Sequence, residues 1–162
     1  MKKCLRYICQ SLMLCLAMIF MLSACDMSDT PYHRYKDISE EGWLNRDTLT
    51  FTVDTIRKPG DYTTYLCLRT QYEYPYRYLS VIVDQVVMPK GKRQQAVKRL
   101  EIVDREGAQK GTGITYHTYE VPVFTETLTP GDSMRVAVKH NMTREQMPGI
   151  IGVGIKVKRK GS

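Results

Sequence analysis

The chain has 162 residues, of which 25% are charged, and its formal net charge is +7. This length suits one domain with a sizeable core, and no second domain is apparent. Three of the 24 basic residues and none of the 17 acidic residues fall in the first 24 positions, so residues 25–162 carry only +4. That excess equals four basic residues near the C-terminus: Lys156, Lys158, Arg159 and Lys160. We interpret them as a basic tail on a neutral body, either a solvated chain end or a contact for anionic head groups.

The N-terminus has the three parts of a secretory signal. Lys2, Lys3 and Arg6 are basic, residues 7–22 form an uncharged and mostly apolar run, and small residues precede Cys25. The apolar run has 16 residues. That is shorter than the roughly 20 residues of a membrane-spanning helix, so a cleaved signal is expected.

Residues 22–25, Leu-Ser-Ala-Cys, resemble the bacterial lipobox. The resemblance implies that residues 1–24 are removed as a signal peptide and that Cys25 carries lipid. Each buried CH₂ of an acyl chain contributes about 0.8 kcal/mol, and two or more chains attach a protein stably to a membrane. The alternative is an ordinary cleaved signal with an incidental cysteine. A protein exported in this way has little reason to meet nucleic acid, so we expect no nucleic-acid partner.

The five cysteines do not indicate a disulfide framework. Cys4, Cys9 and Cys15 lie in the predicted signal, and Cys25 is predicted to carry lipid. Only Cys67 remains, so no intramolecular disulfide is expected. Because Cys67 lies in a strand-like stretch, we expect a buried and inert thiol.

The remaining chain divides into two predicted parts. Residues 25–42 are interpreted as the lipidated N-terminus and a tether, because the segment from Pro31 to Tyr35 fits neither a strand nor a helix. Residues 43–162 are the predicted folded domain. It begins at Trp43, the only tryptophan, which we expect to be largely buried.

From residue 47 onward apolar side chains alternate with polar ones, which is typical of strands. Residues 88–95 and 104–113 are predicted loops, and residues 143–146, Thr-Arg-Glu-Gln, fit a capping box that predicts one helical turn. The predicted strands are residues 49–53, 62–70, 77–87, 97–103, 114–124, 134–139 and 151–157.

Short strands without a long helix predict an all-β fold, an antiparallel β-sandwich (jelly-roll-like) of about seven to eight strands. The expected core residues are Leu49, Phe51, Leu66, Leu68, Val81, Val136, Val138, Val153 and Ile155.

No arrangement of residues indicates catalysis, and we expect the protein not to be an enzyme. His33, His117 and His140 are far apart, without the paired Cys or His spacing of a metal site, and the latter two are expected to be structural. Asp104 and Glu106 could act as an acid–base pair, but the turn composition around them already explains their presence. No cofactor or metal ligand set is predicted.

Tyr72, Tyr74, Tyr76 and Tyr78 are a candidate binding surface, because a spacing of two places side chains on one face of an extended chain. Such a stripe could stack on sugars or peptides. The favoured alternative is structural, because Pro75 interrupts the run and the rings could fill the rim of the core.

Several residues together resemble the gliding-motility lipoprotein GldH family of the Bacteroidetes. They are the lipobox at Cys25, Trp43, Leu68-Arg69, Tyr74-Pro75-Tyr76, Leu79, Asp104, the glycines at 107, 111 and 113, His140-Asn141-Met142, Pro148-Gly149-Ile150 and Gly152-Val153-Gly154. The resemblance implies a lipoprotein of the cell envelope, expected at the outer membrane, that is associated with gliding machinery and its linked secretion apparatus. It implies envelope protein partners and no catalytic residues. Asp26, directly after the predicted lipid site, leaves the choice of membrane open.

Two functions from different classes are therefore expected. The first is a non-catalytic accessory component of the gliding motility or linked secretion apparatus. The second is a lipid-anchored module that binds glycan or peptide through the tyrosine run.

Overall fold

A computed structural model describes residues 29–161 of the chain. This part of the chain forms ten strands and no helix, so it holds no helix that is long and apolar enough to cross a membrane. The strands are β1 (Tyr32–Asp37), β2 (Trp43–Leu44), β3 (Leu49–Val53), β4 (Gly60–Thr70), β5 (Tyr78–Met88), β6 (Lys92–Glu101), β7 (His117–Leu128), β8 (Ser133–His140), β9 (Gln146–Met147) and β10 (Ile150–Arg159).

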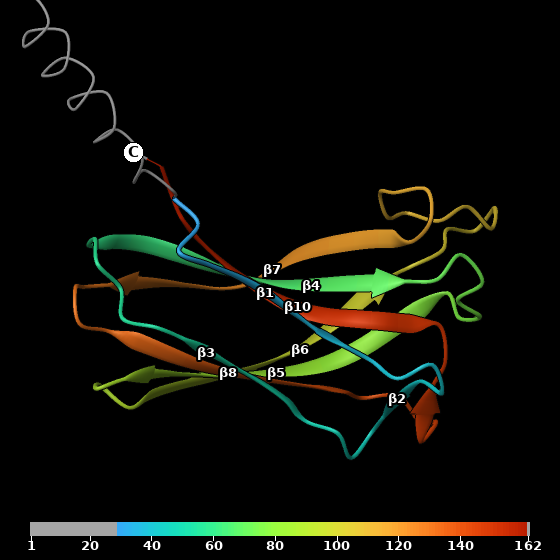
Figure 1. Ribbon diagram of the computed structural model, residues 1–162, viewed down its shortest axis with the longest axis horizontal. Coiled ribbons are helices and arrows are strands. Elements are labelled where there is room, and N and C mark those ends of the chain that lie inside the picture. The colour runs from blue at the N-terminus through green and yellow to red at the C-terminus, as the bar shows by residue number, and fades with distance from the viewer. Residues whose placement is uncertain (1–28, 162) are drawn as a thin grey trace, which may run out of the picture.

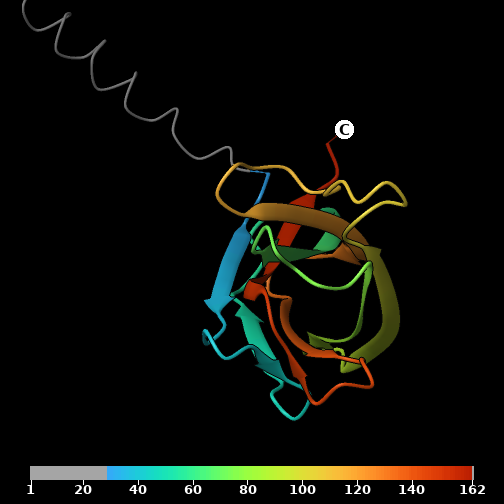
Figure 2. The ribbon, with the colours of Figure 1, turned by 90° about the vertical axis from the view of Figure 1, so that its right-hand side faces the viewer.

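The strands form two packed four-stranded sheets (Figures 1 and 2). The first sheet has the order β1-β10-β4-β7 and the second has the order β3-β8-β5-β6, while β2 and β9 form a separate two-stranded ribbon. Every pairing is antiparallel. The predicted all-β antiparallel sandwich is therefore confirmed. The strands beyond the seven predicted ones are β1, β2 and β9.

The core lies between the two sheets and follows from the period-two pattern of the sequence. In β5, Leu79, Val81 and Val83 are fully buried while the residues between them are half-exposed. Of the nine predicted core residues only Leu49, on the edge strand β3, is half-buried, and the other eight are buried. At roughly 1.5–3 kcal/mol for each large apolar side chain, this burial supplies the main stabilisation of the sandwich.

The interpretation of residues 25–42 as a tether is wrong for β1. This strand pairs with β10 along its whole length, from Tyr32 opposite Val157 to Asp37 opposite Gly152. It lacks an apolar alternation because it is an edge strand on which only Tyr32 and Tyr35 are half-buried. The folded domain therefore begins before residue 43.

The predicted basic tail is also wrong, because β10 continues to Arg159. The Lys156 ammonium lies 2.8 Å from a carboxylate oxygen of Glu120 on β7. Arg159 lies 3.6 Å from the carboxylate of Asp29. Two of the four basic residues thus take part in ion pairs within the described domain.

Two predicted boundaries shift because exposed strands carry polar residues. The loop predicted at 88–95 is short, since β6 already begins at Lys92, opposite Val87. β7 begins at His117 and continues through Pro122. Proline is tolerated there because β7 is an edge strand and has a bulge at this point, where Thr64 faces Phe124 and Tyr65 faces Pro122.

The helical turn predicted at residues 143–146 is absent. Gln146 instead begins β9, which pairs with β2, and its side-chain amide donates to the carbonyl of Glu41 at 2.7 Å. The β2–β9 ribbon covers one end of the core. Trp43 of β2 is 1% exposed, as predicted, and its indole N–H donates to the carbonyl of Asp47 at 3.0 Å.

Candidate functional site

The two ends of the sandwich are different in structure. The described chain enters at one end, where the backbone N–H of Arg159 donates to the carbonyl of Asp29 at 2.6 Å. At the opposite end, residues 71–77 join β4 to β5 and residues 102–116 join β6 to β7 (Figure 1). Cys25, the predicted lipidation site, lies outside the described residues.

The four tyrosines of the predicted stripe lie in different environments. Tyr72 is 70% exposed, whereas Tyr74 is only 4% exposed and its hydroxyl donates to the carbonyl of Tyr78 at 3.3 Å. The Tyr76 ring packs edge-on against Tyr74, with centroids 5.8 Å apart. Burial raises the pKa of Tyr74. The four rings therefore do not share one exposed face, as the structural alternative predicted.

Tyr76 and Tyr78 instead line a shallow hollow together with Arg99 and Met142. The guanidinium of Arg99 lies 3.9 Å from the centroid of the Tyr78 ring, and that of Arg77 lies 5.0 Å from it. The hollow combines aromatic surface with two cations. Chemically it could stack on a flat ring and pair with an acidic group.

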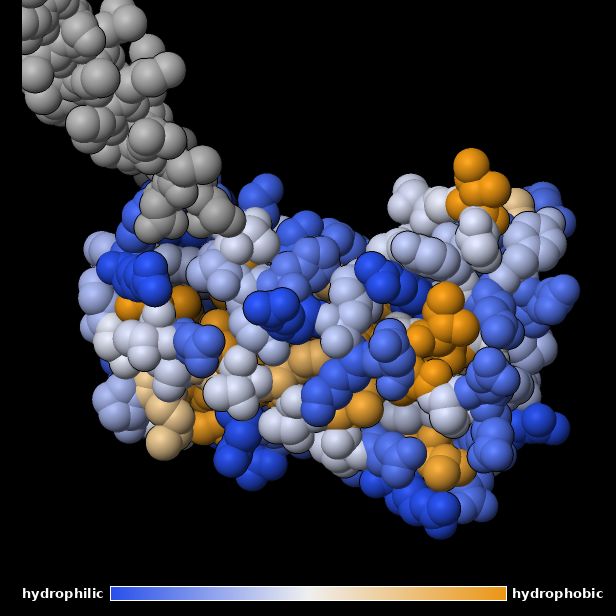
Figure 3. Space-filling model, viewed as in Figure 1, coloured by the Kyte–Doolittle hydropathy of each residue, from blue (hydrophilic) through white to orange (hydrophobic). Residues whose placement is uncertain are grey.

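Three exposed apolar side chains lie on the two loops at the end opposite the chain entry, and we call Tyr72, Ile114 and Tyr116 the distal cluster. Ile114 is 96% exposed, Tyr72 70% and Tyr116 39%. Figure 3 shows apolar atoms standing out from the surface at the upper right, over the loop between β6 and β7. Large contiguous patches of exposed apolar surface usually mark contact sites.

The loop that carries Ile114 and Tyr116 is held in shape by its backbone. Thr112 and Thr118 exchange backbone hydrogen bonds of 2.8 and 3.0 Å across its base. Gly113 has φ +132°, and a Cβ there would lie 2.1 Å from the carbonyl oxygen of Tyr116. Only glycine fits this position.

Asp104 has a structural role in the same loop. One of its carboxylate oxygens accepts hydrogen bonds from the backbone N–H groups of Glu106 (2.9 Å) and Ala108 (2.8 Å). This is the turn chemistry expected from the sequence. It accounts for Asp104 without an acid–base role.

His117 and His140 are both buried, at 8% and 2% exposure. The His140 ring packs edge-on against Trp43 with centroids 5.3 Å apart, and burial lowers its pKa. Both positions agree with the structural role predicted for them.

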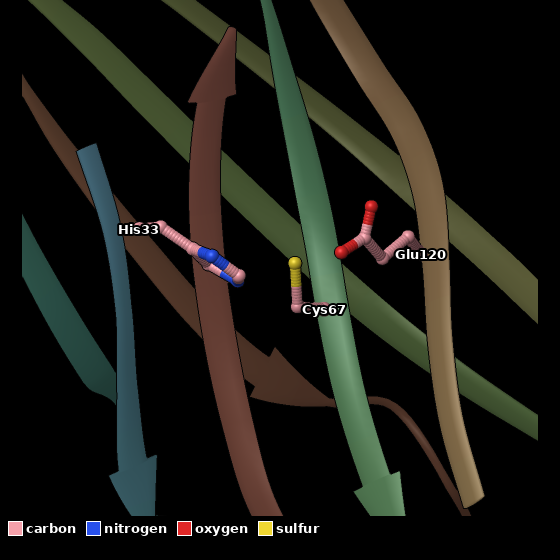
Figure 4. A group of neighbouring side chains, drawn as sticks. All are labelled: His33, Cys67 and Glu120. Carbon is pink, nitrogen blue, oxygen red and sulfur yellow. The ribbon is translucent and has the colours of Figure 1, made fainter. Parts of the chain in front are cut away.

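Cys67 is fully buried on the outer side of the first sheet. Burial raises the pKa of its thiol to about 11, and the nearby carboxylate of Glu120 adds to this rise. The expectation of a buried and inert thiol agrees with this environment. The structure also brings His33 and Glu120 close to Cys67, which no motif or spacing in the sequence predicts (Figure 4).

The described residues thus define an antiparallel β-sandwich domain with exposed apolar side chains at the end remote from its chain entry. The sequence profile of the GldH lipoprotein family matches residues 30–157, which include all but the last two residues of the sandwich. The chain belongs to this family, and the resemblance found in the sequence is confirmed. Membership places the chain among lipoproteins, which lipid holds at the cell envelope.

No curated protein matches the chain. Similar solved structures include the Eiger TNF from S. frugiperda, at 13% identity and a TM-score of 0.35, covering 67% of this chain and 64% of that one. The cycloalternan-forming enzyme from Listeria monocytogenes has 18% identity and a TM-score of 0.38, covering 78% of this chain and 11% of the enzyme. A family GH115 4-O-methyl-alpha-glucuronidase has 10% identity and a TM-score of 0.41, covering 82% and 17%. Likenesses this distant say nothing about function.

Proposed function

We propose that the protein is a lipid-anchored, non-catalytic accessory subunit of a complex in the outer membrane, within the gliding motility apparatus or the secretion apparatus linked to it. The observation that carries the proposal is the family match over residues 30–157. The distal cluster supports it, because a subunit needs a surface that meets its partners.

The position of Cys25 in the sequence gives the domain an orientation. Cys25 precedes Asp29 by four residues, and Asp29 lies at the end where the chain enters the sandwich. Lipid on Cys25 would therefore hold this end close to the membrane. The distal cluster would then face away from the bilayer toward neighbouring proteins.

The anchor is tested by metabolic labelling with a fatty-acid analogue. The wild-type protein should incorporate the label and sediment with membranes, whereas Cys25→Ser should do neither. If Cys25→Ser were still labelled and still membrane-bound, the lipidation site would be elsewhere.

The subunit role is tested by affinity purification of the intact lipoprotein from its own membranes. The wild-type protein should recover envelope proteins in stoichiometric amounts, and the double variant Ile114→Ser, Tyr116→Ser should lose them. Val97→Ser is the matched control, because Val97 is 59% exposed but lies on β6, outside the distal cluster. Partners retained by the double variant, or lost equally by the control, would contradict a role for this surface.

A second function, binding of a glycan or an acidic peptide, is favoured by the hollow lined by Tyr76, Tyr78 and Arg99. A ligand that fits should raise the melting temperature of the wild-type protein, since binding to the folded state adds RT ln(1 + [L]/Kd) to its stability. The shift should vanish in Arg99→Ala and persist in the double variant at Ile114 and Tyr116. If no saccharide or acidic peptide shifted the melting temperature, this function would be excluded in favour of the subunit role.

A further inference from the structure

Three side chains with metal-binding atoms meet on the outer side of the first sheet. His33 comes from β1, Cys67 from β4 and Glu120 from β7, and their donor atoms all lie within 4.8 Å of one another. Figure 4 shows the imidazole of His33 and the carboxylate of Glu120 pointing toward Cys67 from opposite sides. His33 and Glu120 are exposed, while Cys67 is buried.

The register of the sheet produces this convergence. Cys67 lies directly opposite Glu120 on β7 and opposite Gly154 on β10. β10 separates β1 from β4, so the imidazole of His33 has to extend across it to reach the thiol. Gly154 carries no side chain at this point of β10, and the Tyr35 ring of β1 lies against it.

A thiolate, an imidazole and a carboxylate are a typical ligand set for Zn²⁺. Zinc bonds of about 2.0–2.3 Å place the donors of one tetrahedral site roughly 3.3–3.8 Å apart. The donor atoms of His33, Cys67 and Glu120 lie within 4.8 Å of one another. They would have to approach one another by about 1 Å to reach zinc-binding distances. His33 and Glu120 can make this movement by rotamer changes because both are exposed, while the packed sheet holds Cys67 in place.

One carboxylate oxygen of the cluster is already paired with a cation. The Lys156 ammonium lies 2.8 Å from Oε2 of Glu120. The other carboxylate oxygen can turn toward a metal. The Tyr35 hydroxyl is near the sulfur of Cys67 and would donate a hydrogen bond to a thiolate there.

We propose that His33, Cys67 and Glu120 bind one Zn²⁺ ion on the outer side of the first sheet. Binding replaces the proton of the Cys67 thiol: the S–H bond breaks, the sulfur electron pair forms the S–Zn bond, and the proton passes to the buffer. The imidazole and the carboxylate donate the second and third electron pairs. Three protein ligands leave a fourth position for water.

The site links strands that are otherwise joined only through their neighbours. β1 and β7 are the two edges of the first sheet, and an ion bound by both and by β4 would bridge the whole sheet. The ion would also fix β1 close to the point where the chain enters the domain.

The test uses the full-length lipoprotein purified in detergent, with Co²⁺ and Zn²⁺ as probes. One Co²⁺ ion should bind to each chain and give a thiolate-to-cobalt charge-transfer band in the near ultraviolet. Cys67→Ser should lack this band. Calorimetry in buffers of different ionisation enthalpy should show one proton released for each Zn²⁺ bound. His33→Asn and Glu120→Gln should each weaken Zn²⁺ binding at least tenfold.

Glu126→Gln is the matched control, because Glu126 lies on the same strand and its ion pair with Lys92 resembles that of Glu120 with Lys156. It should bind Zn²⁺ as the wild type does. The site would be refuted by wild-type protein that shows no thiolate band. Binding that His33→Asn and Glu120→Gln leave as tight as in Glu126→Gln would also refute it. Both of these substitutions are at exposed positions, so the test does not depend on the folding of Cys67→Ser.

Discussion

Replacing Gly154 by alanine should push β1 away from β10. A Cβ at this position would lie 2.8 Å from the carbonyl oxygen of Arg34 and 2.8 Å from Cδ1 of the Tyr35 ring. The first of these atoms belongs to the backbone of β1, so a side-chain rotation cannot relieve the contact. Overpacking of this kind typically costs about 1–3 kcal/mol of the free energy of unfolding.

Gly152→Ala is a matched control on the same strand and the same face. Its Cβ would meet the carbonyl oxygen of Lys36 at 3.6 Å and Arg69 at 3.8 Å, which are ordinary contacts. Both substitutions reduce the entropy of the unfolded chain by a similar amount. The difference between the two variants therefore isolates the collision of Gly154→Ala with β1.

Two measurements on residues 26–162 report this effect. Urea unfolding followed by the fluorescence of Trp43, the only tryptophan, gives the free energy of unfolding. The reaction of Cys67 with a thiol reagent reports the opening of β1, because Cys67 is the only cysteine in this segment and is fully buried. A loss of 1–3 kcal/mol should raise its reaction rate about 5- to 150-fold in Gly154→Ala, since about 1.4 kcal/mol corresponds to a factor of ten.

Equal stability and equal thiol reactivity in the two glycine variants would refute the close packing of β1 on β10. A destabilised Gly154→Ala with an unreactive thiol would show that the strain is relieved elsewhere in the sheet and that Cys67 stays buried.

The remaining predictions concern the core, the tyrosines and a buried histidine. Leu79→Ala, at a fully buried position, should lower the free energy of unfolding by roughly 2–5 kcal/mol, whereas Val97→Ala should change it by less than about 0.5 kcal/mol; similar urea midpoints would contradict this. Tyr74→Ala should lower the melting temperature strongly because that ring is buried, whereas Tyr72→Ala should leave the melting temperature unchanged because that ring is 70% exposed. Burial lowers the pKa of His140 in the folded protein below its ordinary 6.5. As the pH falls, the imidazole is therefore protonated in the unfolded chain before it is protonated in the folded protein. The contribution of neutral His140 to the free energy of unfolding should be complete above pH 6.5 and should decline below it. The free energy of unfolding of His140→Gln should therefore fall less between pH 7 and pH 5 than that of the wild type.

The parts of the fold that the sequence predicts well are those in which burial alternates. β5 was recognisable because every second side chain from Leu79 enters the core. β1 was missed because an edge strand is held mainly by backbone hydrogen bonds, which leave little trace in the side chains. The capping box at residues 143–146 failed because Gln146 bonds to the carbonyl of Glu41 and its backbone pairs with β2.

The candidate sites were harder to predict, for a related reason. Pro75 correctly indicated that the tyrosines do not form one flat face, but nothing local to the sequence marks Ile114 as 96% exposed. The meeting of His33, Cys67 and Glu120 depends on which strands are neighbours and in which register. A single sequence carries no such information for residues far apart in the chain.

The position of β1 has a mechanical consequence for a protein tethered at its N-terminus. Ladder hydrogen bonds run perpendicular to the strands, so a pull along β1 shears all of them at once, whereas a pull across the sheet peels them one by one. Force between a lipid anchor on Cys25 and a partner on the distal cluster, as proposed above, would act along β1. Single-molecule pulling between Asp29 and Ile114 should therefore meet greater resistance than pulling between Asp29 and Lys160, two residues at the same end of the sandwich. With the proposed lipid on Cys25, the domain would transmit tension along its length.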